Sequence, residues 1–252
     1  FEQLICSAMI HFEAQRPDWL VLEAGLGGRL DATTAHSWRP LIAVASIGMD
    51  HREHLGPNLQ AIAAEKAAAI GEGAHVISAT QEPEVSAVLE QRVNEVQGTL
   101  QWVDALDESW NLGLSGALQK RNGAVAAAAL QWMSTRNEVI SSRAIREGFA
   151  AARWPGRLQW MRWRGLRLRV DGAHNPPAAI ELARERCSWS SAGSRQIWIL
   201  AIQAQKQAPE MLQQLLAPLD EAWIVPVPGH RSWSLGQLKP ALPLQAHQLK
   251  SA

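Results

Sequence analysis

Hydrophobic and polar positions divide much of the chain into short apolar runs that end in charged residues. Residues 20–22 are followed by Glu23, and residues 41–47 lead to Asp50 and His51. Short apolar runs bounded by turns are typical of buried strands in a parallel sheet. Because ligands of such sheets bind beyond the carboxyl ends of the strands, we expect one crevice to collect the following side chains: Glu23, Asp31, Asp50, His51 and His54.

Other segments repeat their apolar residues at helical or strand spacing. Helical patterns predict helices over residues 1–16, 59–70, 82–96 and 141–151. Apolar runs predict further strands over residues 75–79, 158–163, 166–170, 197–202 and 223–227. Residues 102–111 fit neither pattern. The alternation of strands with helices indicates an α/β protein.

The most specific motif begins at Glu23. Residues 23–34 read E-A-G-L-G-G-R-L-D-A-T-T, residues 50–56 read D-H-R-E-H-L-G, and residues 65–67 read E-K-A. Each piece alone has an ordinary explanation, as a capping acid, a turn or a surface lysine. Together and in this order they resemble the folylpolyglutamate synthase/dihydrofolate synthase group of the Mur-ligase superfamily. Members carry E-x-G-L-G-G-R-L-D-A-T-N, so Thr34 departs from the usual asparagine.

The resemblance implies an α/β fold with two domains. Residues 1–153 would be the remainder of a Mur-ligase-type central ATPase domain, a parallel sheet with helices. Residues 154–252 would form a smaller Rossmann-like C-terminal domain. The pair Pro155-Gly156 lies at this boundary, and a Pro-Gly pair after a helix is a linker signal.

Catalytic and metal-binding roles follow from the same resemblance. Glu23 and His51 would bind one or two Mg²⁺ ions, for which a carboxylate and an imidazole are acceptable ligands. Lys66 matches a lysine that is carbamylated in the family, and an unmodified ammonium group beside Mg²⁺ would repel the ion. Without the family, a surface lysine is the default explanation. His174 is the second catalytic candidate.

Three residues are expected to contact a folate. The resemblance places Phe1 against the folate ring and Leu30 and Asp31 along its pocket. From the sequence alone, an aromatic residue at the start of a helix belongs equally well in a hydrophobic core. This alternative stays open for Phe1.

Nucleotide-binding residues come from two later segments. The resemblance assigns this role to Asn122, Arg157, Asp171 and His174, the last two within D-G-A-H-N-P at 171–176. A guanidinium suits bidentate phosphate binding. Taken alone, residues 171–176 would be an ordinary strand-to-helix turn. Two departures weaken the match, because Leu118 replaces a histidine, and glutamines rather than acids flank the lysine at 205–207.

The activity implied is ATP-dependent amide formation. L-glutamate would be joined to dihydropteroate, to a reduced folate, or to both, through an acyl phosphate. No segment matches the phosphate-binding loop G-x-x-x-x-G-K-[ST], so the sequence is interpreted as a fragment without that loop and without the extreme C-terminus. The alternative is a truncated or degenerate relative that keeps the fold without catalysis. A cyanophycin-type ligase is disfavoured by residues 26–33.

Composition adds expectations about partners. The formal net charge is +0, which suggests neither a nucleic-acid nor an anionic-membrane partner. No apolar run approaches the roughly 20 residues that span a bilayer. Cys6 and Cys187 lack a metal-binding spacing and are expected to be buried thiols in a reducing cytoplasm. The family suggests a monomer.

Overall fold

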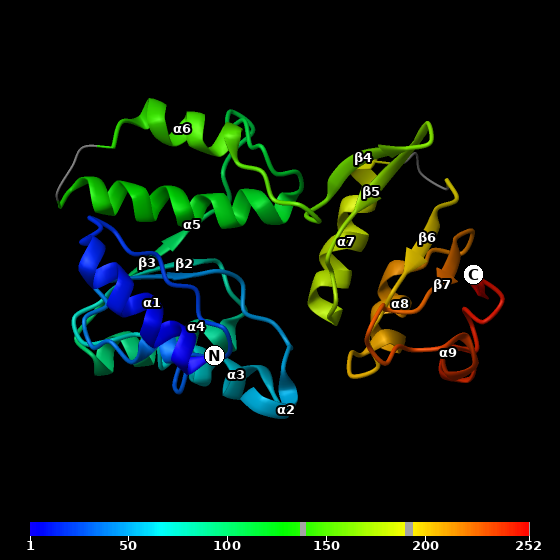
Figure 1. Cartoon of the computed structure of the whole chain (residues 1–252), viewed down its shortest axis with the longest axis horizontal. Helices are drawn as coiled ribbons and strands as arrows, with labels where there is room; N and C mark the ends of the chain where they lie inside the picture. Colours follow the sequence, from blue (N-terminus) through cyan, green and yellow to red (C-terminus); the bar gives the residue numbers. More distant parts are fainter. Residues whose placement is uncertain (137–139, 190–193, 252) are drawn as a thin grey trace. The chain divides into compact units, whose positions relative to one another are not determined.

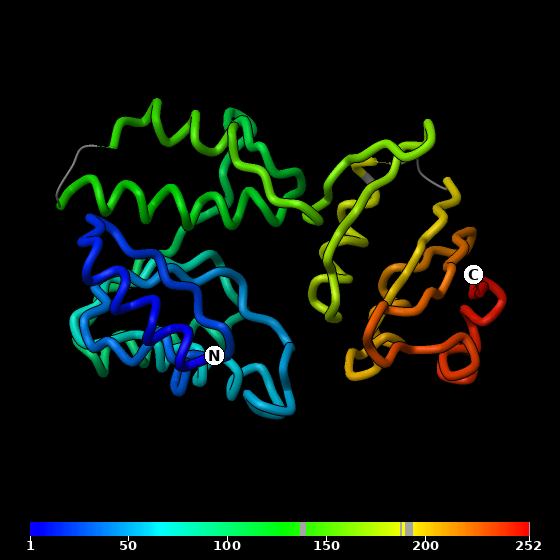
Figure 2. Tube along the Cα trace, viewed as in Figure 1, coloured from blue at the N-terminus to red at the C-terminus, as the bar shows by residue number. Residues whose placement is uncertain are grey.

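The computed structural model describes residues 1–136, 140–189 and 194–251, and its chain path is shown in Figures 1 and 2. It divides into two compact units. The N-terminal unit comprises Phe1–Asn111 and Lys120–Ala151, and the C-terminal unit comprises Leu112–Gln119 and Ala152–Ala252. Both units contain a parallel sheet with helices, as the α/β prediction requires.

The N-terminal unit is built on a sheet of order β1-β2-β3. Its strands are β1 (Leu41–Val44), β2 (His75–Ala79) and β3 (Thr99–Val103), and both pairings are parallel. The central strand is the most deeply buried. Parallel strands of this kind are covered on both faces, and this explains their continuous apolar sequence.

Helices cover opposite faces of this sheet (Figure 1). On one face, α3 (Leu59–Ala67) and α4 (Pro83–Glu95) pack in the cluster that contains Val76. On the other face, α5 (Ala117–Ser134) packs in the cluster that contains Ile77. Adjacent side chains of β2 therefore serve two cores, because side chains alternate across a strand.

The remaining elements of this unit lie outside the sheet: α1 (Glu2–Gln15), η1 (Ala32–Thr34), α2 (Arg52–Leu55) and α6 (Ser142–Ala151). The helix predicted over residues 1–16 is confirmed as α1. Ile5 and Phe12 on its apolar face are half-buried, whereas Leu4 is exposed. Cys6 is also exposed, so the expectation of a buried thiol is wrong for this residue.

The strand predicted at 20–22 is not formed. Residues 19–24 have no regular structure, and Val21 is 89% exposed. A strand needs a neighbour to bond its backbone, and no strand of the described residues pairs with this segment. Conversely, β3 was not predicted, although T-L-Q-W-V at 99–103 has the residues of a strand.

In the C-terminal unit, β4 (Gln159–Trp163) and β5 (Leu166–Val170) form the expected antiparallel hairpin. Arg164 and Gly165 turn the chain with φ of 48° and 80°. Two consecutive residues with positive φ match the type I′ turn that two-residue hairpins prefer.

A second parallel sheet, of order β6-β7-β8, forms the core of this unit. Its strands are β6 (Ile197–Leu200), β7 (Glu221–Ile224) and β8 (Leu249–Ser251). The helices are α7 (Pro176–Trp189), α8 (Ala208–Leu215) and α9 (Leu235–Ala241). Leu212, Leu238 and Leu249 pack together in its core.

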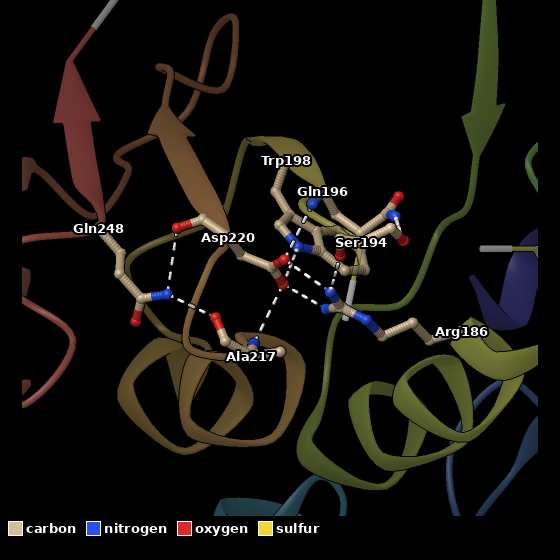
Figure 3. A network of polar contacts seen from close by, with 7 residues as sticks. All are labelled: Arg186, Ser194, Gln196, Trp198, Ala217, Asp220 and Gln248. Atoms are coloured by element: carbon tan, nitrogen blue, oxygen red, sulfur yellow. Dashed lines mark hydrogen bonds and ion pairs between the residues drawn. The ribbon is translucent and has the colours of Figure 1, made fainter. Parts of the chain in front are cut away.

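Asp220 lies just before β7, and its buried carboxylate is the centre of a network of hydrogen bonds (Figure 3). Its carboxylate accepts hydrogen bonds from both terminal nitrogens of Arg186, from Trp198 Nε1 at 3.0 Å and from the Ala217 amide at 3.0 Å. Burial opposes ionisation, but these hydrogen bonds and that of Gln196 lower the Asp220 pKa to about 2. The network joins α7, β6 and the loop before β7.

Among the described residues, no helix combines the length and the apolar character that crossing a bilayer requires.

Candidate functional site

Asp31 is the centre of the glycine-rich turn in the N-terminal unit. The side chain is buried, with 8% of the residue exposed, and accepts hydrogen bonds from the Leu26 amide at 2.9 Å and the Thr33 amide at 3.0 Å. The Thr33 hydroxyl donates a third bond at 2.6 Å. Burial alone would raise the pKa of Asp31, but the bonds from Thr33, Leu26 and Gly25 lower it. Asp31 is therefore a carboxylate that shapes the turn.

The two central glycines of the turn pack against the next two motif segments. A Cβ on Gly27 would lie 2.9 Å from Leu55 Cδ2, in α2. A Cβ on Gly28 would lie 2.8 Å from the Lys66 carbonyl oxygen, in α3. At Gly28 the neighbouring atom belongs to the helix backbone, so only glycine fits there without displacement of that backbone. The turn thus packs against two segments, the one that follows Asp50 and the one that contains Lys66.

Arg29 and Glu65 hold the turn on α3. The Arg29 amide donates to the Glu65 carbonyl at 3.1 Å, and Arg29 Nε lies 2.8 Å from Glu65 Oε1. Sequence reasoning assigned no role to either residue. Their opposite charges within two matching motifs are the only sequence signal that could have indicated this contact.

Lys66 lies in the last turn of α3 and is half-buried. Its backbone meets the glycine turn, as described above. The structure therefore brings the segment of Lys66 and the segment of Asp31 together, as the motif order suggested.

His51 and Asp50 form a compact turn before α2. His51 has φ of 50°, its amide donates to Asp50 Oδ1 at 2.9 Å, and its Nε2 lies 3.6 Å from Asp50 Oδ2. A non-glycine residue at positive φ is uncommon and is often found at functional sites.

The predicted metal ligands do not form a complete site. Glu23 is exposed, and no hydrogen bond or ion pair joins it to His51. Among residues 1–136, 140–189 and 194–251, no group of three or more His, Cys, Asp or Glu side chains could hold a metal ion. The described residues therefore do not fit a protein-only metal centre.

Phe1 and Asp31 both lie against Gly25, and this places two predicted folate contacts together. A Cβ on Gly25 would lie 3.1 Å from Phe1 Cζ and 3.4 Å from Asp31 Oδ2. The Phe1 side chain is thus directed at the turn, yet the residue is 62% exposed and is no core aromatic. Leu30, the third predicted contact, is 92% exposed.

In the C-terminal unit, two loops that carry predicted nucleotide contacts are joined. The Leu158 amide donates to Asp171 Oδ2 at 2.8 Å, and the Gly172 amide donates to the Gly156 carbonyl at 2.8 Å. Asp171 Oδ1 also accepts from the Ala173 amide at 2.8 Å. Arg157 lies in these joined loops and is exposed, and its Nη1 would be 3.7 Å from a Cβ added to Gly172.

His174 borders a pocket of about 350 Å³ at the carboxyl ends of β6 and β7. Its Nδ1 lies 2.8 Å from the Gly172 carbonyl, and the ring is exposed. Lys206 and Gln203 line the same pocket, together with Ala173, Ala201, Ile202 and Val227. Lys206 has no role assigned from the sequence, and no sequence pattern indicates that it shares a pocket with His174.

Asn122 lies in α5 and is half-buried, and it belongs to the N-terminal unit. Arg157, Asp171 and His174 belong to the C-terminal unit. Three of the four predicted nucleotide contacts therefore belong to the C-terminal unit and one to the N-terminal unit.

No protein-family model matches the chain. Individual relatives do. Dihydrofolate synthetase of Saccharomyces cerevisiae is 32% identical over 247 residues, which cover 88% of this chain and 57% of the relative. The chain belongs to the dihydrofolate synthase/folylpolyglutamate synthase family. Dihydrofolate synthase/folylpolyglutamate synthase of Bacillus subtilis is 30% identical over 241 residues, 85% of this chain and 55% of the relative. This family member therefore spans a little over half the length of these relatives.

Solved structures show the same fold. A folylpolyglutamate synthase of Mycobacterium tuberculosis complexed with ADP and AMPPCP aligns with a TM-score of 0.86 and 24% identity, over 99% of this chain and 62% of that chain. Escherichia coli FolC in complex with DHPP and ADP aligns with a TM-score of 0.76 and 28% identity, over 92% of this chain and 56% of that chain. The Mur-ligase fold expected from the sequence is confirmed.

Proposed function

We propose that the protein carrying this chain is an ATP-dependent ligase that joins L-glutamate to dihydropteroate, to a reduced folate, or to both. Family membership supports this assignment, because relatives named for both activities match most of the chain. The structural observation that supports this assignment most directly is the contact between Gly28 and the segment of Lys66. This contact brings together two of the motifs by which the sequence resembles the family.

The proposed reaction has two steps. A carboxylate of the folate attacks the γ-phosphate of ATP and forms an acyl phosphate with release of ADP. The amino group of glutamate then attacks the acyl carbon, and phosphate leaves. Both steps gather negative charge, so positively charged side chains must stabilise the transition states.

Residues of the N-terminal unit would bind the folate and orient the reacting groups. Phe1, Leu30 and Asp31 are proposed folate contacts, and the lowered pKa of Asp31 keeps a negative acceptor at the turn. Lys66 is the proposed carbamylated lysine. Glu23 and His51 are the proposed protein ligands of Mg²⁺, which would arrive with ATP and neutralise phosphate charge when bound.

Residues of the C-terminal unit would bind anions. Arg157 is proposed to contact the ATP phosphates, with Asp171 and His174 as further nucleotide contacts and His174 as a catalytic candidate. Asn122 is the proposed nucleotide contact on α5. Lys206 suits a carboxylate or phosphate oxygen in the pocket that it shares with His174.

The remaining expectations are proposals too. Residues 1–153 and 154–252 are proposed as the two domains, and the enzyme is proposed to be monomeric and cytoplasmic.

The test is phosphate release by the natural full-length protein, with ATP, dihydropteroate or tetrahydrofolate, and glutamate. We expect release that requires all three substrates, and we expect Lys66→Ala to abolish it. Lys250→Ala is the matched control, because Lys250 is an exposed lysine on β8. No release from any substrate combination would contradict the proposal and favour a non-catalytic relative.

A further inference from the structure

Glu185 lies in α7 and joins this helix to the first turn of α5. Its Oε1 accepts a hydrogen bond from the amide of Ala117, the first residue of α5, and its Oε2 lies 3.4 Å from Ser188 Oγ. The first amides of a helix have no partner inside the helix, and a negative charge is favourable beside them. Ala117 and Glu185 both belong to the C-terminal unit. The proposed function assigns no role to Glu185.

The residue before α5 packs against both Glu185 and the loop of Arg157. A Cβ on Gly116 would lie 3.3 Å from Glu185 Oε1 and 2.6 Å from Leu158 Cδ1. Leu158 is buried, and its amide donates to Asp171 Oδ2 at 2.8 Å. Contacts therefore lead from Glu185 to Leu158, and from Leu158 to Asp171. Arg157 directly precedes Leu158 in the chain.

The backbone of Leu158 has a conformation that depends on these contacts. Its φ is 43°, in the left-handed region that residues other than glycine rarely adopt. Such a conformation persists only where the surrounding structure enforces it. Here the bond to Asp171 and the packing of Gly116 on the side chain supply that constraint. A change at Glu185 would therefore reach the loop of Arg157.

Arg169 links the same residues electrostatically. Its guanidinium lies 4.3 Å from the centre of the Trp160 ring and 4.6 Å from that of Trp189, and its Nε is buried without a hydrogen-bond partner among the described residues. Burial lowers the pKa of Arg169 below its ordinary value, although the charges of Glu185 and Asp171 act in the opposite direction. Both carboxylates thus interact with one cation that the two rings hold in place.

We propose that Glu185 is a positioning residue for nucleotide binding by the C-terminal unit. This inference rests on the proposed function, which makes Arg157 and Asp171 nucleotide contacts. Glu185 acts through other residues and not on the nucleotide itself. Its carboxylate holds the start of α5 against Leu158, and that contact keeps the two nucleotide contacts in their binding geometry. A charged acceptor makes the stronger hydrogen bond, so the carboxylate is better suited to this role than an amide.

The first test follows amide hydrogen exchange in this 252-residue chain by NMR. Glu185→Ala should speed the exchange of the Leu158 amide about tenfold, because its bond to Asp171 opens more often. The amide of Ala222, which donates to the Gln248 carbonyl in the second sheet, should exchange at an unchanged rate. A purely stabilising role of Glu185 would speed both amides alike.

The second test is the kinetics of the natural full-length protein. Glu185→Ala should raise the KM for ATP about tenfold and leave kcat within about twofold, as expected when binding alone is weakened. Glu185→Gln keeps an acceptor oxygen and loses the charge, so it should raise this KM only about threefold. Glu210→Ala is the matched control, because Glu210 is an exposed acid of the same unit, in α8, and should change neither constant.

If Glu185→Ala fails to fold, Ala117→Pro tests the same contact from its other side. This substitution removes the amide that donates to Glu185, and proline is well tolerated at the first position of a helix. It should speed the exchange of the Leu158 amide and raise the KM for ATP as Glu185→Ala does.

Three results would overturn the inference. These are an unchanged exchange rate at Leu158, equal acceleration at Leu158 and Ala222, and an active Glu185→Ala enzyme with an unchanged KM for ATP. The exchange measurement needs neither ATP nor a folate. An unmodified full-length protein without activity would therefore contradict the ligase proposal, and the exchange rates would still decide whether Glu185 positions these loops.

Discussion

Gly28 lies so close to Lys66 that a Cβ added to the glycine would be 2.8 Å from the lysine carbonyl oxygen. The same Cβ would be 3.0 Å from the Glu65 carbonyl oxygen and 3.0 Å from Ala69 Cβ. Backbone atoms of a helix cannot move aside as a flexible side chain can. The glycine turn and α3 therefore form one unit, and the residues of the candidate site in this unit depend on it.

Gly28→Ala should lower the free energy of unfolding by about 1–3 kcal/mol, because it overpacks the contact with α3. Urea denaturation followed by circular dichroism measures this change. Gly148→Ala is the control, since nothing lies within 4 Å of the Cβ it adds in α6. It should raise stability by about 0.5–1 kcal/mol, as expected for glycine inside a helix. Loss of stability in both variants, or in neither, would contradict the packing account.

Arg186→Met should lower the free energy of unfolding by about 3–5 kcal/mol, because it leaves the fully buried Asp220 carboxylate without its cation. Arg184→Met is the control on the same helix, since Arg184 forms an exposed pair with Glu181. It should cost less than about 1 kcal/mol. Thermal unfolding of both variants distinguishes the two cases, and similar losses would show that Asp220 does not depend on Arg186.

Acid should weaken the C-terminal unit through Asp220. Its pKa is about 2 in the folded protein, against an ordinary value of 3.8. A lowered pKa stabilises the fold above pH 3.8, and this contribution of roughly 2 kcal/mol is lost as the pH falls from about 4 to about 2. The measurement is the free energy of unfolding against pH. Asp220→Asn should remove this part of the slope, and an unchanged slope would refute the assignment.

Asp31→Ala should lower the free energy of unfolding by at least about 2 kcal/mol, because Leu26 and Thr33 lose their buried acceptor. Denaturant midpoints report the change. Asp107→Ala is the comparison, since Asp107 accepts from the Ser109 amide at an exposed position and should matter little. Equal midpoints for Asp31→Ala and the unmodified chain would mean that the turn does not need its carboxylate.

Much of the fold could be predicted from local sequence patterns. The exact bounds of β2 and β5 followed from apolar runs between turns, and α1, α4 and α6 from helical spacing. Residues 20–22 have the same apolar pattern as β2, yet they form no strand in this structure. A pattern reports the burial that a segment prefers but not whether a strand lies beside it.

The candidate site could be predicted only in part. Motif order suggested that the segments of Asp31, Asp50 and Lys66 meet, and the contacts of Gly27 and Gly28 show how. The pocket of His174 and Lys206 could not be predicted, because it depends on the spatial arrangement of β6 and β7. The Glu23 and His51 pair remains a prediction, since no contact joins these residues.

The most direct test of the ligase account is the mass of the product that the natural full-length protein forms from dihydropteroate, glutamate and ATP. The account predicts a product heavier than dihydropteroate by one glutamyl residue, absent in Lys66→Ala and retained in Lys250→Ala. A product that forms without ATP, or the absence of any glutamyl adduct with dihydropteroate and with tetrahydrofolate, would contradict it.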